Sequence, residues 1–330
     1  MKTYPLKRWV PLVFTVLAFN CPADINTYMP EPPPGGRLVD IGGRTLHIKC
    51  LGEGAPTVVL DSGVGGFSLE WTPVQRLLAG KVKICAYDRG GYAWSEPGPP
   101  PRTTSQLVRE LHTLLHNAGL APPYVLAGHS FGGYNVMYFA KRYPQETAGL
   151  ILVDSSHPEQ TQRLPDIPAR RDNSGTSNVV TLFQGQSTFD WYPEDVRPML
   201  MQALSSYYLY QTQRWESLNF SLSARQVEHA GALPDVPLVV LTRGKRAWPD
   251  DPYGIALERE WQKMQGEMAG FVPHGRQVIA AHSGHLIHLE QPDLVADAIL
   301  SVVTDARNHP RAPGVVSAVQ GPAAESIDPD

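Results

Sequence analysis

A serine flanked by glycines carries the most evident chemistry in this sequence. The segment GHSFGG places Ser130 between Gly128 and Gly132, which is the pattern G-x-S-x-G. An apolar run precedes it, as expected of a strand, and a helical pattern follows it to about Tyr143. Where a strand turns sharply into a helix, glycines near the serine let the two elements pass closely and leave its hydroxyl exposed. The motif therefore predicts that Ser130 is a nucleophile.

A serine hydroxyl needs a base to take its proton, and histidine is the usual base. Among the 11 histidines, His285 lies in a glycine-containing turn after a short apolar run, downstream of the serine. His282 and His288 lie three residues away on either side and are the alternatives; otherwise we expect them to orient or cover the turn. His129, inside the serine motif, is expected to pack or to form hydrogen bonds rather than to act as the base.

Three segments together resemble the α/β-hydrolase family. Besides GHSFGG, they are YDRGGYAWSEP at residues 87–97 and SGHLIHLEQPDLV at residues 283–295. These two are similar to the family's segments D-R-x-G-x-G-x-S and G-H-x-x-x-x-E-x-P, with Ala93 in place of one glycine. The resemblance covers residues 38–303 and implies a triad in the order Ser, Asp, His, with His285 as the base.

The family's activities include those of esterases, lipases, amidases, C–C bond hydrolases, dehalogenases and epoxide hydrolases. Its dehalogenases and epoxide hydrolases use an aspartate nucleophile, so Ser130 disfavours them. The resemblance therefore implies a serine hydrolase that cleaves a carboxylic ester, with an apolar acyl ester as its small-molecule substrate, through an acyl-enzyme. An amidase, a C–C bond hydrolase, an acyltransferase and a non-catalytic binding module of the same fold are the alternatives.

The resemblance leaves the position of the triad's acid open. The family's commonest position follows the strand expected here at residues 238–242. The turn after that strand, RGKRAWPDD, has no carboxylate directly after Gly244. It offers Asp250 and Asp251 only further on, beyond a proline.

Other branches of the family carry the acid at the end of the preceding strand, which here is residues 150–153 followed by Asp154. An aspartate there would lie at the carboxyl edge of the sheet, the edge that presents Ser130. We therefore expect Asp154 to orient His285, with the two later aspartates as alternatives. If Asp154 is not the acid, it is expected to cap the end of its strand.

Ester hydrolysis through a tetrahedral intermediate also needs hydrogen-bond donors for the oxyanion. Phe131 follows the nucleophile at a helix N-terminus, where backbone N–H groups are free and the helix dipole is positive. The second donor should come from the turn SGVGG, residues 62–66, which stands where the family often has His-Gly. Alignment to that motif implies Val64 as the second donor, with Gly63 as the fallback.

The elements that position these residues are predicted to form an open α/β sheet. Uninterrupted apolar runs alternate with helical patterns, which is typical of parallel strands covered on both faces. Strands are expected at residues 44–50, 57–61, 82–88, 124–128, 150–154, 238–242 and 278–281. Thr103 and Gln106 suggest a capping box for a helix that Gly119 ends. Asp88 and Arg89 are expected to hold together the glycine-containing turn that follows them.

The fold class predicted is therefore the α/β-hydrolase fold, with a mostly parallel central sheet flanked by helices and an inserted helical lid. A structureless loop as long as residues 155–235 would be unusual, and a helix is expected near residues 194–219. The aromatic residues of this insertion should form its core, with some of them lining an apolar pocket. They are Trp191, Tyr192, Tyr207, Tyr208, Tyr210 and Trp215. The domain limits expected are 1–23 for a signal peptide or N-terminal anchor, 24–36 for a Pro/Gly linker, 37–154 and 236–306 for the hydrolase core, 155–235 for the lid and 307–330 for a disordered tail.

Composition and the N-terminus bear on partners and location. A net charge of −4 gives no general electrostatic case for binding nucleic acid or anionic lipid. There is no phosphate loop, dinucleotide fingerprint or HExxH motif, so no cofactor or metal is expected. Basic residues precede a short apolar run at residues 9–19, which predicts export to the periplasm or the medium. An uncleaved anchor and a lipid-bearing Cys21 are the alternatives, and membrane attachment is expected only through this segment.

In the usual strand order of the family, the strand that holds Cys50 neighbours the one that holds Cys85. Export would place both cysteines in an oxidising compartment, where a disulfide could form. Two buried reduced thiols are the alternative.

Overall fold

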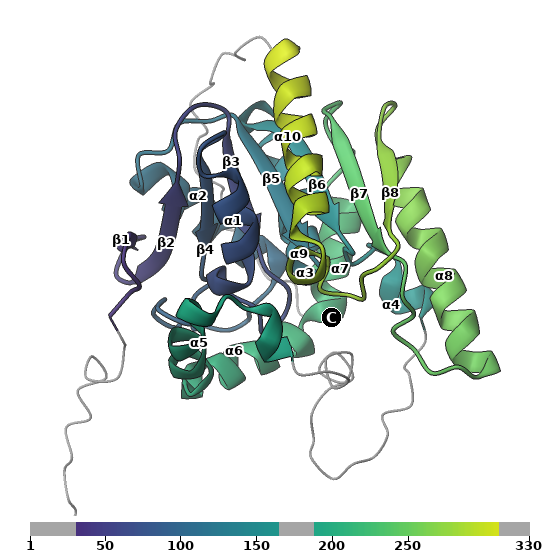
Figure 1. Cartoon of the computed structure of the whole chain (residues 1–330), viewed down its shortest axis with the longest axis horizontal. Helices are drawn as coiled ribbons and strands as arrows, with labels where there is room; N and C mark the ends of the chain where they lie inside the picture. Colours follow the sequence, from purple (N-terminus) through teal and green to yellow (C-terminus); the bar gives the residue numbers. More distant parts are fainter. Residues whose placement is uncertain (1–30, 165–187, 310–330) are drawn as a thin grey trace, which may run out of the picture.

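Eight strands form a single sheet in the computed structural model, which describes residues 31–164 and 188–309 (Figure 1). The strands lie side by side in the order β1, β2, β4, β3, β5, β6, β7, β8. β2 pairs antiparallel with β1 and with β4, and every other neighbouring pair is parallel. Their bounds are Gly36–Asp40, Thr45–Leu51, Thr57–Asp61, Ile84–Tyr87, Tyr124–His129, Thr147–Val153, Leu238–Arg243 and Arg276–Ala280 for β1 to β8. The mostly parallel sheet predicted from the sequence is confirmed.

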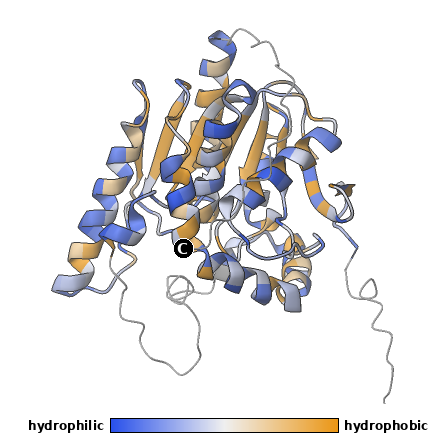
Figure 2. Ribbon diagram, turned by 180° about the vertical axis from the view of Figure 1, so that it is seen from behind, coloured by the Kyte–Doolittle hydropathy of each residue, from blue (hydrophilic) through white to orange (hydrophobic). Residues whose placement is uncertain are grey.

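Helices cover both faces of the sheet. One face is covered by α1 (Thr72–Leu78), α9 (Ile287–Glu290) and α10 (Pro292–Asn308), and the other by α2 (Thr104–Asn117), α3 (Phe131–Arg142), α7 (Phe220–His229) and α8 (Pro252–Ala269). Successive residues of a strand point to opposite faces, so Val58 and Leu60 join the core under α1 and α10 while Val59 joins the core under α2 and α3. Figure 2 shows the result, an apolar sheet between helices whose outer sides are polar.

Three expectations about these elements need correction. β1 was not expected; it begins at Gly36, inside the expected linker, and takes the edge position next to β2. Thr103 does stand at the N-cap of α2, but its side chain makes no capping hydrogen bond, and Gln106 donates instead to the carbonyl of Pro99 at 3.0 Å. Helix α10 extends to Asn308, two residues beyond the expected limit of the core.

The two cysteines lie directly opposite each other in the antiparallel pairing of β2 with β4. Their Cα atoms are 4.0 Å apart, and a disulfide joins Cys50 to Cys85. Of the two alternatives that the sequence left open, the structure therefore shows the disulfide. It ties the antiparallel edge of the sheet to the parallel part.

The segment between β6 and β7 contains several short helices. They are α4 (Gln160–Arg163), η5 (Thr188–Trp191), η6 (Glu194–Val196), α5 (Arg197–Leu204), α6 (Tyr207–Leu218) and α7. Figure 1 shows α5 and α6 beyond the end of the sheet where the parallel strands terminate. Tyr192, Leu200 and Leu209 pack there with Phe67 and Leu286, which belong to loops at the carboxyl ends of strands.

The expected aromatic core of this insertion is only partly present. Tyr192 is buried, whereas Tyr207 and Tyr210 are 72% and 60% exposed. The signal peptide or anchor at residues 1–23, most of the linker, residues 165–187 of the insertion and nearly all of the expected tail lie outside the described residues. Within residues 31–164 and 188–309, none of the helices has both the length and the apolar character needed to cross a membrane.

Candidate active site

Ser130 lies in a strained turn between β5 and α3. Its φ of 50° and ψ of −119° are unfavourable for a residue with a side chain. The turn is possible because its neighbours are glycines. A Cβ on Gly128 would clash with the carbonyl of Gly132, and a Cβ on Gly132 would clash with the carbonyl of Asp61 in β3. The sequence motif therefore has a direct steric cause, and it leaves Ser130 9% exposed at the carboxyl edge of the sheet.

The other two residues of the expected triad reach the same edge from β6 and β8. Asp154 directly follows β6, and the Ser130 N–H donates to the carbonyl of Val153, its neighbour, at 3.2 Å. His285 lies in the loop between β8 and α9. Its carbonyl accepts a hydrogen bond from His129 Nε2 at 3.0 Å, and the two imidazole rings are 4.6 Å apart. The residue before the serine thus anchors the loop that holds the histidine.

One of the three candidate carboxylates contacts His285. Asp154 Oδ2 lies 2.6 Å from His285 Nδ1. Asp251 instead caps α8, accepting a hydrogen bond from the N–H of Gly254 at 2.7 Å. Asp250 is 75% exposed and pairs with Arg246 at 2.9 Å. The structure therefore brings together Asp154 and His285 and gives the two later aspartates other roles.

Asp154 is fully buried, yet it is held as an anion. Burial alone would raise its pKa, but the Arg243 guanidinium at 2.8 Å and hydrogen bonds from His285 and Trp261 lower the pKa to about 2. A carboxylate at this position accepts a hydrogen bond from His285 Nδ1–H, so the lone pair of the ring lies on Nε2. That tautomer can take a proton from a serine.

Sequence reasoning missed Arg243 and Trp261. Arg243 ends β7, where the family's commonest acid would follow, and its guanidinium carbon lies 4.7 and 4.6 Å from the ring centroids of Trp248 and Trp261. It also pairs with Glu258 at 3.1 Å, one turn of α8 before Trp261. The available signal was an arginine at the end of an otherwise apolar strand, because a buried arginine needs a buried carboxylate.

The two candidate oxyanion donors belong to segments next to Ser130. Phe131 is the first residue of α3, so its N–H is not used by the helix ladder. Val64 lies in residues 62–66, here called the oxyanion loop, which directly follows β3. A Cβ on Gly63 would lie 3.2 Å from Ser130 Cβ, which shows how closely this loop approaches Ser130.

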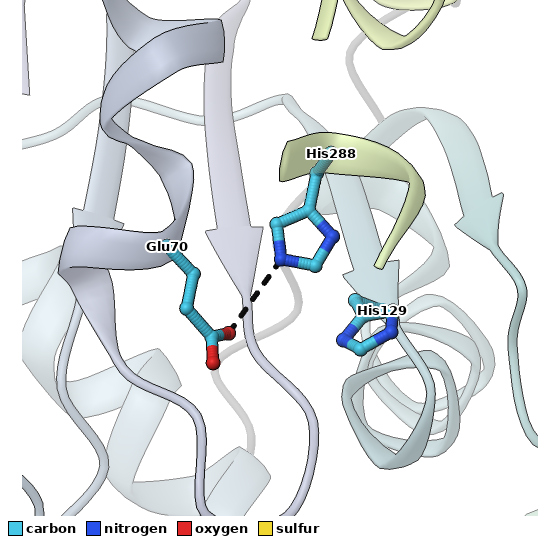
Figure 3. Close-up of side chains that lie close together, drawn as sticks. All are labelled: Glu70, His129 and His288. Atoms are coloured by element: carbon cyan, nitrogen blue, oxygen red, sulfur yellow. Dashed lines mark ion pairs between the residues drawn. The ribbon is translucent and has the colours of Figure 1, made fainter. Parts of the chain in front are cut away.

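Among the described residues, one group has the composition of a metal site. It consists of Glu70, His129 and His288 (Figure 3). Their ligand atoms lie within 4.8 Å of one another, and His288 Nε2 is 3.6 Å from Glu70 Oε2. Zinc bonds of roughly 2.0–2.2 Å would require every pair of ligand atoms to lie about 3.4 Å apart. Burial lowers the pKa of His129 well below its usual value, so this ring is neutral. These polar atoms could hold a cation or equally well a bridging water.

A cavity of about 840 Å³ lies at the opposite end of the sheet. Pro56, Pro123 and Thr147, at the amino ends of β3, β5 and β6, are among the residues that line it. None of the expected site residues does. It is therefore separate from the site at the carboxyl edge.

Comparisons with known proteins identify the family of this chain. Residues 58–298 match the sequence model of the Alpha/beta hydrolase family. The uncharacterized protein YqjL of Bacillus subtilis is 27% identical over 264 residues, covering 78% of this chain and 87% of YqjL. RutD of Pantoea ananatis, named by inference as a carbamate hydrolase, is 26% identical over 281 residues, covering 80% of this chain and 95% of RutD. The structure of a thermophilic esterase from Thermogutta terrifontis has a TM-score of 0.55 at 23% identity, covering 82% of this chain and 98% of the esterase. The family match spans most of the chain and includes the turn of Ser130, and the chain therefore belongs to the α/β-hydrolase family.

Proposed function

We propose that the protein is a serine hydrolase that cleaves carboxylic esters through an acyl-enzyme intermediate. The observation that supports this most directly is the 2.6 Å contact between Asp154 and His285 at the edge of the sheet that carries the strained Ser130. A carboxylate, a histidine and a serine in these positions have the roles of orienter, base and nucleophile. A binding protein would have no use for this combination.

In the first half of the reaction, His285 Nε2 takes the proton of Ser130 Oγ as the oxygen attacks the ester carbonyl. The negative charge that develops on the carbonyl oxygen is stabilised by the N–H groups of Phe131 and Val64. His285 then gives its proton to the departing alcohol, and the acyl group stays on Ser130. Asp154 stabilises the imidazolium formed between these two transfers.

In the second half, water replaces the alcohol. His285 takes a proton from the water, whose oxygen attacks the acyl carbon, and the same two N–H groups stabilise the second tetrahedral intermediate. Collapse of that intermediate returns the proton to Ser130 and releases the carboxylic acid. The names of the similar proteins, an esterase and an inferred carbamate hydrolase, are consistent with attack of this kind on an acyl carbon.

We also propose that the protein is exported, with its apolar acyl ester reaching it outside the cytoplasm. The Cys50–Cys85 disulfide supports this, because such bonds persist mainly in oxidising compartments. Membrane attachment, if the N-terminal segment is retained, would be through that segment alone. Fractionation of cells, with Edman sequencing of the recovered protein, tests both points.

The proposed reaction is tested by reaction with a fluorophosphonate probe and by turnover of a panel of acyl esters, amides, carbamates and lactones. We expect the wild-type chain to be labelled and to prefer esters. Ser130→Ala should abolish labelling, and Ser130→Ala and His285→Ala should each reduce kcat by about 10³–10⁶-fold. Because the two residues act as a unit, the double variant should lose little more. Near-normal turnover by Ser130→Ala would show that the mechanism is wrong.

A further inference from the structure

Arg89 is a buried arginine beside the candidate active site, and the mechanism above gives it no role. It follows β4 by two residues, and its guanidinium is almost fully buried. An arginine side chain has five N–H donors, and all of them are used here. Two donate to Glu216 at 2.8 and 2.9 Å, and the other three face the loop after β3. A guanidinium matched at every donor is held in one orientation.

The three remaining donors fix the end of β3 and the first two residues after it. Arg89 Nη1 donates to Asp61 Oδ1 at 2.7 Å and to the Ser62 carbonyl at 2.6 Å, and Nη2 donates to the Gly63 carbonyl at 2.6 Å. In a trans peptide, the C=O and the N–H of the next residue point in opposite directions. Because both carbonyls point at Arg89, the N–H groups of Gly63 and Val64 point away from it.

The same loop lies against Ser130. A Cβ on Gly63 would lie 3.2 Å from Ser130 Cβ and 3.1 Å from His129 Nδ1. Gly63 and Val64 are the two residues from which the second oxyanion donor is expected. The bonds from Arg89 to the two carbonyls therefore fix the orientation of the two peptide groups that carry the candidate donors, next to Ser130.

Glu216 connects this arrangement to the insertion. It lies on α6 and is fully buried, and it accepts a hydrogen bond from the Tyr92 hydroxyl at 2.8 Å in addition to the two from Arg89. The same hydroxyl accepts a hydrogen bond from the N–H of Gly65 at 3.0 Å. Helix α6 is thus joined to the oxyanion loop by two bridges, one through Arg89 and one through Tyr92.

We propose that Arg89 and Glu216 are positioning residues for the oxyanion hole, and that helix α6 through them controls the rate of the chemical step. This inference rests on the proposed function, because it needs an oxyanion to form. It assigns Arg89 more than the structural role in its own turn that the sequence predicted. The Asp88 carboxylate also binds outside its own turn, contrary to the sequence prediction, accepting hydrogen bonds from the N–H of Ser68 and from His47, each at 2.7 Å.

The test compares Arg89→Met, Arg89→Lys and Glu216→Gln with Arg102→Met in the full chain. Arg102 is a matched control, because it is a buried arginine bound through two nitrogens to Glu110 at 2.7 and 2.9 Å. For each protein, kcat and KM are measured on a p-nitrophenyl ester, with active sites counted by the fluorophosphonate probe. Inhibition by a trifluoromethyl ketone, which forms a tetrahedral adduct with an oxyanion, is measured in parallel. Thermal unfolding reports stability separately.

We expect Arg89→Met to lower kcat by about 10²–10³-fold with KM changed by less than about threefold, as for loss of one oxyanion donor. The inhibition constant of the ketone should rise by the factor by which kcat/KM falls. Arg89→Lys should recover part of both, because it retains a cation, and Glu216→Gln should show the same pattern with a smaller loss. Arg102→Met should unfold at a lower temperature while its labelled sites keep normal kcat.

Two results would overturn the inference alone. One is an active wild-type chain whose Arg89→Met and Glu216→Gln variants keep normal kcat per labelled site. The other is a loss of kcat in these variants without weaker binding of the ketone. A wild-type chain that is neither labelled nor active on any ester would instead overturn the proposed function, and this inference with it. If Arg89→Met does not fold, the Glu216→Gln and Arg89→Lys results decide between these outcomes.

Discussion

Asp154 is the residue whose role the structure makes easiest to test, because Asp251 supplies a natural control. Asp154→Asn should lower kcat by about 10⁴-fold, since an amide cannot hold His285 in the tautomer that accepts the serine proton. Asp251→Asn should keep near-normal kcat, because asparagine caps a helix as well as aspartate does and Asp251 contacts Gly254 rather than His285. Steady-state kinetics on one ester, with far-UV circular dichroism to confirm folding, provide the measurement. The assignment fails if the two variants behave the other way round.

The same residues show what sequence can and cannot reveal about a site. Ser130 and His285 are recognisable because their turns need particular neighbours in the chain, such as Gly128. Asp154 could be proposed because the carboxyl ends of neighbouring parallel strands converge at one edge. The role of Arg243 could not be proposed, because its partners are Asp154, after β6, and Glu258, in α8. These segments come together only when the chain folds. Whether a charged residue pairs across the fold or merely holds its own turn is not encoded in its local pattern.

At the scale of the elements, sequence patterning predicted seven strands near their true positions, and β3 to β7 were recognisable as apolar runs because their side chains are buried on both faces of the sheet. β1 was not predicted, because it is short and most of its residues are exposed or partly exposed, so its sequence contains no apolar run. The capping box failed for a different reason. The Gln106 side chain donates to the carbonyl of Pro99 in the preceding loop instead of taking part in the cap. A motif defined by residues 103 and 106 alone does not include that acceptor.

The disulfide between β2 and β4 should contribute to the stability of this part of the sheet. Replacing both cysteines by alanine should lower the free energy of unfolding by about 2–4 kcal/mol, because the unfolded chain regains the freedom of a loop that spans a separation of 35 residues. Urea unfolding of the double variant and of the wild type, each with and without a reducing agent, measures this. Reduction should destabilise only the wild type. Equal stability of all four samples would mean that the bond adds nothing to folding.

For the whole molecule, the buried Asp154 predicts how stability falls in acid. Its pKa is lowered from 3.8 to about 2 on folding, so the folded chain binds this proton less readily than the unfolded chain. The stabilisation, about 2 kcal/mol, is fully present above about pH 4 and is lost as the pH falls through about 2. The charged form is favoured because Arg243 and Trp261 are already oriented toward the carboxylate, so a proton on Asp154 leaves the buried Arg243 cation more poorly paired.

The measurement is the difference in unfolding free energy between the wild type and Asp154→Asn, from urea titrations between pH 6 and pH 2. We expect this difference to shrink by about 2 kcal/mol over that range, because the asparagine cannot titrate whereas Asp154 loses its charge. Other buried carboxylates, including Asp61, whose pKa burial raises, titrate in both proteins and cancel in the difference. Asp195→Asn is the control: Asp195 pairs with Arg76 at the surface, so its difference from the wild type should stay small at every pH. A difference for Asp154→Asn that is equally flat would mean that Arg243 does not hold Asp154 as an anion, and the account of the site's electrostatics would have to be abandoned.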